Sequence, residues 1–318
     1  MKILFLDTAH PFLKKELEEN NFSCDEDITS SKEEIEKKIS QYDGIILRSR
    51  INIDKQFIDS FSLPSGKGRF IARIGAGMEH IDVTYAESKG IKCISSPEGN
   101  RNAVAEHALG MLLNLLDHIS KANAEVKSGK WIREANRGTE LEGKTIGIYG
   151  YGNTGSAFAK ILQGFGVKIL AFDKYKKNFG NAQVKESATD EIFSNTDVLS
   201  LHLPLTEETK HLVNTSFISK FKKNIYLINT SRGPIVKTDD LVKNLESGKI
   251  LGAGLDVLEY EETSFELIRS STKIDQPEAL QYLFNSNKVI LTPHIAGWSF
   301  ESGEKMARIL ARKIIELK

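Results

Sequence analysis

The chain has 318 residues, a length that predicts two domains at ~100 to 200 residues each. Its 43 Lys and Arg balance 43 Asp and Glu, so no overall positive field draws it to nucleic acid or anionic lipid. Two cysteines, Cys24 and Cys93, are too few for a disulfide framework or a four-thiolate zinc site. The apolar runs are too short for a signal peptide or a membrane span, so we expect a cytoplasmic protein.

Short apolar runs alternate with charged stretches of helical period in the first part of the chain. This alternation predicts a parallel sheet built from strand-helix-strand units. Turns at 75–77 and 96–100 follow the third and fourth strands, at the carboxyl ends where open α/β sheets bind ligands. The expected strands are 3–6, 44–47, 70–74 and 91–94, and the expected helices are 12–19 and 32–39.

A second series of strands begins after a long apolar helix, expected from Asn102 to about residue 122, and a polar arm around Trp131. With helices between them, these strands predict a complete doubly wound domain of the Rossmann type. We expect residues 301–317 to form one helix and residues 262–281 a surface loop with a short helix. The expected strands are 145–149, 168–172, 198–201, 225–228, 251–255 and 289–291.

The segment Gly150-Tyr151-Gly152-Asn153-Thr154-Gly155 matches the glycine-rich pattern that binds dinucleotides. A strand precedes it, a helix follows it, and Asp173 ends the next strand, which is the context that the pattern requires. The glycines would let the backbone approach a pyrophosphate at the N-terminus of the helix. Asp173 would bind the adenine ribose and repel a 2′-phosphate, which favours NAD over NADP, although three lysines could soften that selection: Lys174, Lys176 and Lys177.

Three later strands bring a cation, an acid and an imidazole to one edge of the sheet. Arg232 follows the strand 225–228, an acidic run after Asp256 follows the next strand, and His294 follows the last one. Oxidising a hydroxyl group requires a base for its proton, and an imidazole titrates near ~6.5. A carboxylate would orient the ring, and a guanidinium would clamp a substrate carboxylate. The three groups predict hydride transfer between a hydroxyacid and NAD, with no metal required.

The chain resembles the D-isomer-specific 2-hydroxyacid dehydrogenases along essentially its whole length. The matching segments are 75–77 with 81–82, 97–106, 140–144, 150–155, 202–204, 229–233 and 292–297. The resemblance implies that the catalytic set is Arg232, Glu261 and His294, where the family spacing from Asp256 selects Glu261. It also implies that Gly75, Ala76 and Gly77 donate backbone N–H groups to the substrate carboxylate. Finally, it implies that the cofactor is lined by His202, Pro204, Thr230 and Asp256.

The resemblance further implies an α/β fold of two domains, a Rossmann-type sheet and a flavodoxin-like substrate domain that is split in sequence. Residues 1–99, completed by 296–318, would bind substrate, and residues 100–295 would bind NAD. The apolar helix and the arm around Trp131 imply a homodimer, as in the family. The chain departs from the family at Glu262, where proline is usual, at Lys237 and at Trp298. Trp298 either shapes the substrate pocket or packs at the domain junction.

The identity of the hydroxyacid depends on the segment Arg48-Ser49-Arg50. Residues two apart on a strand share a face, so Arg48 and Arg50 could bind one anion, and a phosphate would suit them. The segment is similar to that of the 3-phosphoglycerate dehydrogenases of serine biosynthesis, which favours oxidation of 3-phosphoglycerate to 3-phosphohydroxypyruvate. Two solvated arginines are the alternative reading of the segment. A glyoxylate or hydroxypyruvate reductase, an erythronate-4-phosphate dehydrogenase and a non-enzymatic, corepressor-like NAD sensor also stay open.

Overall fold

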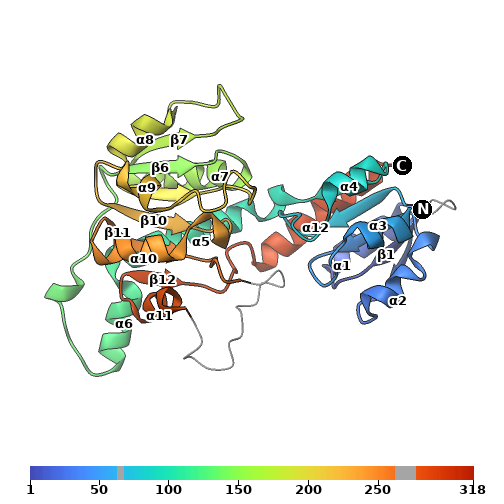
Figure 1. Cartoon of the computed structure of the whole chain (residues 1–318), viewed down its shortest axis with the longest axis horizontal. Coiled ribbons are helices and arrows are strands. Elements are labelled where there is room, and N and C mark those ends of the chain that lie inside the picture. The colour runs from blue at the N-terminus through green and yellow to red at the C-terminus, as the bar shows by residue number, and fades with distance from the viewer. Residues whose placement is uncertain (63–67, 262–276) are drawn as a thin grey trace. The chain divides into compact units, whose positions relative to one another are not determined.

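The computed structural model describes residues 1–62, 68–261 and 277–318 (Figure 1). They form two compact units, one made of Met1–Arg101 with Trp298–Lys318 and the other of Asn102–Gly297. The expected boundaries, after residue 99 and before residue 296, lie near these limits, and the roles expected of the two parts stay predictions. The loop expected at 262–281 lies outside the described residues as far as residue 276.

The first unit contains a parallel sheet in the order β2-β1-β3-β4-β5. This is the flavodoxin-like order, in which the direction of winding reverses between β1 and β3. The edge strand β2 was not predicted, because its sequence Ser-Cys-Asp-Glu is polar and partly exposed and so lacks an apolar run. The strands are β1 (Lys2–Phe5), β2 (Ser23–Glu26), β3 (Gly44–Leu47), β4 (Phe70–Arg73) and β5 (Lys92–Ser95).

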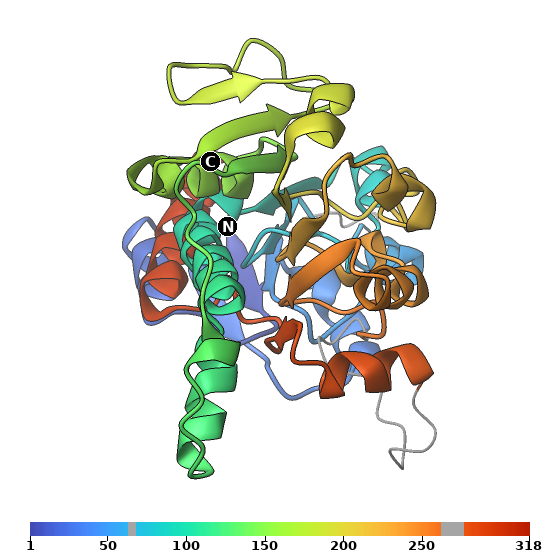
Figure 2. The ribbon, with the colours of Figure 1, turned by 90° about the vertical axis from the view of Figure 1, so that its left-hand side faces the viewer.

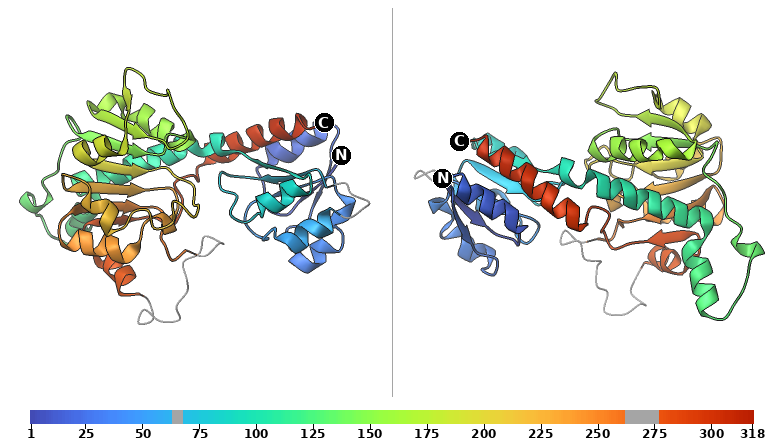
Figure 3. Two further views of the ribbon diagram at one scale, coloured as in Figure 1. Left: turned by 45° about the horizontal axis from the view of Figure 1, so that its top comes forward. Right: turned by 180° about the vertical axis from the view of Figure 1, so that it is seen from behind.

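Helices cover both faces of this sheet. The last helix returns to the first unit and packs beside α1, where Leu13, Leu17 and Leu310 share one apolar cluster with β1 (Figure 3). A capping box at Ser299 and Ser302 begins that helix, since each hydroxyl accepts a bond from the other residue's backbone N–H. The helices are α1 (Pro11–Glu19), α2 (Lys32–Glu36), η1 (Ile39–Gln41), α3 (Lys55–Phe61), α4 (Val83–Ser88) and α12 (Phe300–Ile315).

The second unit contains a parallel sheet in the order β12-β11-β10-β9-β6-β7-β8. This is the order of dinucleotide-binding sheets with one more strand at the edge, and its winding reverses between β6 and β9. The predicted α/β class with two parallel sheets is therefore confirmed. The three-residue edge strand β8 was missed because it buries a single apolar side chain, Val184. The strands are β6 (Thr145–Tyr149), β7 (Lys168–Phe172), β8 (Val184–Glu186), β9 (Val198–Leu201), β10 (Ile225–Asn229), β11 (Ile250–Leu255) and β12 (Val289–Leu291).

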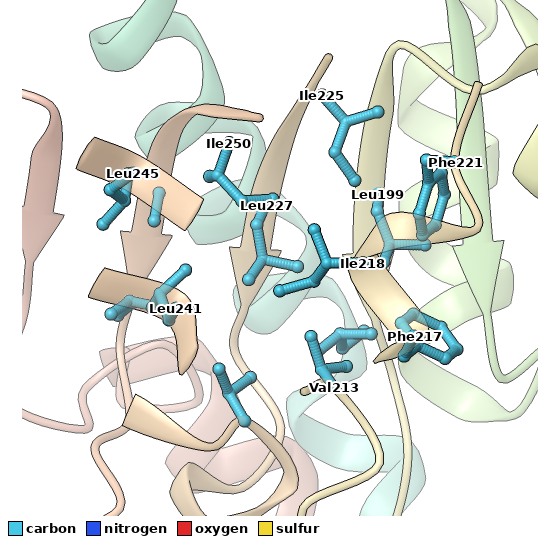
Figure 4. Packing of buried hydrophobic residues seen from close by; sticks show 14 of the residues in the cluster. Leu199, Val213, Phe217, Ile218, Phe221, Ile225, Leu227, Leu241, Leu245 and Ile250 are labelled. Atoms are coloured by element: carbon cyan, nitrogen blue, oxygen red, sulfur yellow. The ribbon is translucent and has the colours of Figure 1, made fainter. Parts of the chain in front are cut away.

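Two apolar layers enclose the second sheet. On one face α5 and α7 pack on side chains such as Ile146 and Ile148 (Figure 3). On the other face α9, α10 and α11 cover Leu199 and Leu227 (Figure 4). The helices are α5 (Pro97–Asp117), α6 (Ile119–Lys127), η2 (Glu134–Asn136), α7 (Asn153–Ile161), η3 (Leu162–Phe165), α8 (Thr189–Asn195), α9 (Thr215–Ser219), η4 (Gly233–Ile235), α10 (Thr238–Glu246) and α11 (Glu278–Asn285).

The long apolar helix differs from its prediction at both ends. It begins at Pro97 rather than at Asn102, so the turn expected at 96–100 is largely its first turn, where a proline costs no hydrogen bond. It ends before His118, whose φ of 54° breaks the helical path, and α6 follows. The chain returns alongside α6, as Figure 2 shows, because Lys121 and Glu125 bind the 135–136 segment. Within the described residues, no helix is both long and apolar enough to cross a bilayer.

Candidate active site

Two glycines of the loop between β6 and α7, Gly150 and Gly155, have no room for a side chain. A Cβ on Gly150, whose φ is 97°, would lie 2.3 Å from the carbonyl oxygen of His202. A Cβ on Gly155 would lie 2.1 Å from the carbonyl oxygen of Gly150, which explains why α7 approaches the loop so closely. A Cβ on Gly152 would meet no atom within 4 Å. The loop therefore leaves open space at Gly152, where α7 begins with Asn153.

Asp173 follows β7 and places a fixed, ionised carboxylate beside this loop. Its Oδ2 accepts a 2.8 Å hydrogen bond from the backbone N–H of Tyr151, and its Oδ1 accepts bonds of 2.9 Å and 2.8 Å from Tyr175 and Lys176. Burial alone would raise the pKa of Asp173, but these backbone donors outweigh it and hold the pKa below its ordinary value. The adjacent Lys174 pairs with Glu208 instead of with Asp173.

His202 contacts the glycine loop through the side chain of Thr154. Its Nε2 lies 2.9 Å from Ser200 Oγ, and its Nδ1 lies 3.1 Å from Thr154 Oγ1. Burial lowers the pKa of His202 to about 3, so the ring is neutral at physiological pH. Both ring nitrogens have protein partners, so His202 supports the loop, and the lining role that the resemblance implies stays a prediction.

Two further expected cofactor residues lie at the ends of neighbouring strands. Pro204 is exposed after β9, and its carbonyl oxygen accepts a 2.7 Å bond from Thr209. Thr230 follows β10, and its buried Oγ1 has no hydrogen-bond partner among the described residues. A buried hydroxyl without a partner is costly unless a ligand satisfies it. Together with the space at Gly152 and the carboxylate of Asp173, it fits a dinucleotide such as NAD.

Glu261 and His294 meet at the ends of β11 and β12. His294 Nδ1 lies 2.7 Å from Glu261 Oε2, and Glu261 Oε1 accepts a 2.6 Å bond from the backbone N–H of Leu258. The two side chains are 21% and 15% exposed. The nearby Glu259 has other partners: its Oε1 lies 2.6 Å from His211 Nε2, and its Oε2 accepts a 2.8 Å bond from the backbone N–H of Thr238. Of these two acids, it is therefore Glu261 that faces His294.

Asp256 holds the turn that carries His294. Its side chain is 1% exposed, and its oxygens accept bonds from Thr292 Oγ1 at 2.6 Å, Ile295 N at 2.9 Å and Ala296 N at 2.8 Å. These three donors engage both carboxylate oxygens, and the lining role that the resemblance implies for Asp256 stays a prediction. Sequence reasoning also missed His107, whose Nε2 lies 2.9 Å from Thr292 Oγ1. Its signal in the sequence was a histidine next to Glu106, just before the apolar half of α5.

Arg232 lies on the turn after β10. Its Nη1 donates a 2.7 Å bond to the carbonyl of Ser231, and its own carbonyl accepts a 3.0 Å bond from Asn229 Nδ2. A Cβ on Gly233 would lie 1.8 Å from the carbonyl oxygen of Leu258, so this turn packs directly on the loop that leads to Glu261. Because β10, β11 and β12 are parallel neighbours, the three predicted catalytic groups lie on one edge of the sheet.

The two arginines after β3 have different surroundings within the first unit. Asp7 fixes their turn by accepting bonds from the backbone N–H groups of Arg48, Ser49 and Arg50. The guanidinium of Arg50 donates to three carbonyl groups, of Leu6, Ser30 and Asp27, at 2.7, 2.6 and 2.9 Å. These contacts hold Arg50 on the 27–30 loop, and the expectation that Arg48 and Arg50 reach one anion stays a prediction.

Arg48 instead stacks on the ring of Trp298, 4.1 Å from its centroid. Burial lowers the pKa of Arg48 below its ordinary value, and the negative charge of Asp7 opposes that effect. Among the described residues, the side chain of Arg48 donates no hydrogen bond that would compete with a ligand. Trp298, one of the residues at which the chain departs from the family, is 67% exposed, and its ring packs on Arg48.

The turn Gly75-Ala76-Gly77 follows β4 in the same unit. The φ of Gly75 is 137°, and its carbonyl accepts a 2.9 Å bond from the N–H of Ser96 at the start of α5. Ser96 Oγ and Asn100 Oδ1 are buried and lack a partner among the described residues. Sequence analysis placed a ligand-binding turn at 96–100 without choosing these side chains, and they join the candidate substrate residues.

Known proteins share both the sequence and the fold. The family description "D-isomer specific 2-hydroxyacid dehydrogenase, NAD binding domain" matches residues 109–296. The chain is 36% identical to a hydroxypyruvate reductase of Thermotoga maritima, over 90% of this chain and 88% of that one. It is 36% identical to a D-3-phosphoglycerate dehydrogenase of Synechocystis sp., over 89% of this chain and 48% of that one. A solved D-2-hydroxyisocaproate dehydrogenase superposes with a TM-score of 0.82 at 25% identity, over 99% of this chain and 96% of that one.

These matches cover the glycine loop and the strands that carry Arg232, Glu261 and His294. The chain therefore belongs to the D-isomer-specific 2-hydroxyacid dehydrogenases and is an NAD-dependent oxidoreductase.

Proposed function

We propose that this enzyme interconverts a phosphorylated D-2-hydroxyacid, 3-phosphoglycerate, and its 2-keto acid, with His294 as the proton-transfer group. The contact between His294 Nδ1 and Glu261 Oε2, at 2.7 Å, carries the catalytic part of the proposal. A carboxylate that accepts a bond from one ring nitrogen orients the ring and favours its protonated form. Glu261 is itself held by the N–H of Leu258, so the pair has a defined geometry.

The chain's own groups divide the work of the reaction. The proton is assigned to His294 Nε2, on the side of the ring away from Glu261, which accepts it in the oxidation and returns it in the reduction. Arg232 binds the substrate carboxylate with paired donors. Bound NAD supplies the hydride acceptor. Gly152, Asp173 and Thr230 are the residues that would hold it.

The choice of a phosphorylated substrate depends on Arg48. Its guanidinium is partly desolvated and stacked on Trp298, and it follows β3 at the point where the sheet reverses direction. Open α/β sheets bind ligands at such a point, outside the carboxyl ends of the strands. A guanidinium with donors to spare there suits a phosphate group.

A second candidate substrate is an unphosphorylated acid, hydroxypyruvate or glyoxylate. The engagement of Arg50 with three backbone carbonyls favours it, because that leaves Arg48 as the single arginine of the pair to balance a phosphate dianion. The relatives are divided in the same way between reductases and phosphoglycerate dehydrogenases.

A substrate panel followed by NADH absorbance tests the proposal. The panel holds 3-phosphoglycerate, D-glycerate, erythronate 4-phosphate, hydroxypyruvate and glyoxylate. We expect Arg48→Gln to raise the KM for 3-phosphoglycerate roughly 10-fold or more, the value of a charged hydrogen bond, with less than about 3-fold change for hydroxypyruvate. Arg50→Gln is the matched control and should lower stability without separating the two substrates. Equal effects of Arg48→Gln on both substrates would support the unphosphorylated acids instead.

The catalytic assignment has its own matched pair. Glu261→Gln keeps an oxygen near His294 but removes the charge, so kcat should fall roughly 10- to 100-fold. Glu259→Gln removes the charge beside His211 and should leave kcat within about 3-fold. His294→Gln should lower kcat by about 100-fold or more while NAD binding is retained. NAD binding without turnover of any acid in the panel would refute the proposal.

We further expect the enzyme to work as a homodimer. Helix α6 and the arm around Trp131 expose large apolar side chains that a second copy could cover: Ile119 is 54%, Val126 50% and Trp131 80% exposed. Sedimentation equilibrium of the enzyme and of Trp131→Glu tests this expectation. A monomer at micromolar concentration in both samples would contradict it.

A further inference from the structure

His107 lies in the candidate active site, but the proposed chemistry gives it no role. It lies on α5, 185 residues from Thr292 in sequence, with its Nε2 2.9 Å from Thr292 Oγ1. We propose that His107 is a positioning residue for the proton transfer, acting through Thr292 and Asp256 on the turn that carries His294. The inference rests on the role proposed for His294.

The direction of each hydrogen bond in this chain of groups follows from its chemistry. Thr292 has a single hydroxyl proton, and its Oγ1 lies 2.6 Å from Asp256 Oδ1. That proton is donated to Asp256, so Thr292 Oγ1 must accept from His107. His107 therefore carries its proton on Nε2.

The turn beyond Thr292 requires support, because His294 has a φ of 54°. Left-handed backbone is unfavourable for a residue with a side chain, so the turn persists only when its surroundings hold it. Asp256 provides that hold on both sides of His294. Its backbone carbonyl accepts from His294 N at 2.8 Å, and its carboxylate accepts from the N–H groups of Ile295 and Ala296.

Helix α5 gives His107 a fixed reference point. Ala105, Ala108 and Met111 are buried in the core that α5 shares with the sheet. A Cβ on Gly254 would lie 3.2 Å from Met111 Cβ, which shows how tightly α5 packs on β11. The side chain of His107 is 23% exposed, while Asp256 is 1% exposed. A donor lost from His107 is thus felt at a carboxylate that water reaches poorly.

Replacement of His107 by Leu and by Gln tests the inference. His107→Leu removes the donor, so kcat should fall about 3- to 10-fold, the range of one neutral hydrogen bond, while substrate KM and the NAD dissociation constant stay within about 2-fold. His107→Gln places an amide N–H near the position of Nε2 and should restore kcat to within about 2-fold of the native enzyme. In a Thr292→Val background, His107→Leu should cause a smaller further fall, because the 2.9 Å partner is gone and only Asp256 Oδ1, 3.6 Å from His107 Nε2, is left nearby.

A kcat of His107→Leu equal to that of the native enzyme would overturn the inference, as would a His107→Gln variant as slow as His107→Leu. If His107→Leu does not fold, the imidazole nitrogens of ¹⁵N-histidine-labelled native enzyme decide by NMR, where an Nδ1–H tautomer of His107 would overturn it. His294→Gln separates the two proposals. Full turnover by His294→Gln would sink the proposed function, whereas an inactive His294→Gln beside a fully active His107→Leu would sink only the positioning role.

Discussion

Replacing Gly155 and Gly152 by alanine, one at a time, separates the packing of the glycine loop from its contact with NAD. The Cβ of Gly155→Ala would lie 2.1 Å from the carbonyl oxygen of Gly150 and 3.2 Å from Ile148 Cγ2. Neither neighbour can move freely, because one is backbone in a left-handed turn and the other is a buried strand residue.

Overpacking of this kind costs typically about 1–3 kcal/mol, and a clash with backbone places Gly155→Ala near about 3 kcal/mol. At about 2–4 °C per kcal/mol for a unit of this size, the melting temperature should fall by roughly 6–12 °C. The Cβ of Gly152→Ala meets nothing within 4 Å, and the φ of Gly152 is −83°, so stability should change by less than about 1 kcal/mol. The methyl group of Gly152→Ala would occupy the open space where we expect the pyrophosphate of NAD, so NAD affinity should fall about 10-fold or more.

Differential scanning calorimetry and fluorescence titration with NADH measure the two effects on each variant. We expect Gly155→Ala to be less stable than the native enzyme, and Gly152→Ala to be as stable as the native enzyme but to bind NADH weakly. A Gly152→Ala variant with native affinity would show that the open space is not used by the cofactor. A Gly155→Ala variant with native stability would show that α7 can move away from the loop.

Three further predictions concern charge and accessibility. Burial lowers the pKa of His202 to about 3, so as pH falls below ~6.5 the unfolded chain binds a proton at this residue and the native state does not. His202→Asn should therefore reduce the decrease in the free energy of unfolding between pH 6.5 and 4.5. Urea titrations that show the same pH dependence for both proteins would refute this. Asp173→Ser should weaken NAD more than NADP in fluorescence titrations, with Lys174→Ala as the control, and an unchanged NAD to NADP ratio would contradict the role of the carboxylate. Burial raises the pKa of Cys24 and Cys93 to about 11, so alkylation at pH 8 should be roughly 100-fold slower than in urea, and equal rates would show that the thiols are exposed.

The sequence by itself was sufficient for features that depend on neighbouring residues. The strand, the glycine loop and the following helix are contiguous, so the pattern 150–155 predicted a dinucleotide site, and the family match confirms NAD. Alternating apolar runs predicted the α/β class for the same reason. Prediction failed at the sheet edges, where β2 and β8 are held by backbone pairing to one neighbour and need few apolar side chains.

Contacts between distant segments were decided only by the tertiary structure. Spacing relative to Asp256 could rank Glu259 and Glu261, but the paths of the loops after β11 and β12 put one acid on His211 and the other on His294. A shared strand face predicted that Arg48 and Arg50 act together, yet the carbonyls of the 27–30 loop hold one of them. The local sequence pattern determines which side chains follow the ends of the strands. Hydrogen bonds and packing between remote segments determine where those side chains point, because the partners are not neighbours in the chain.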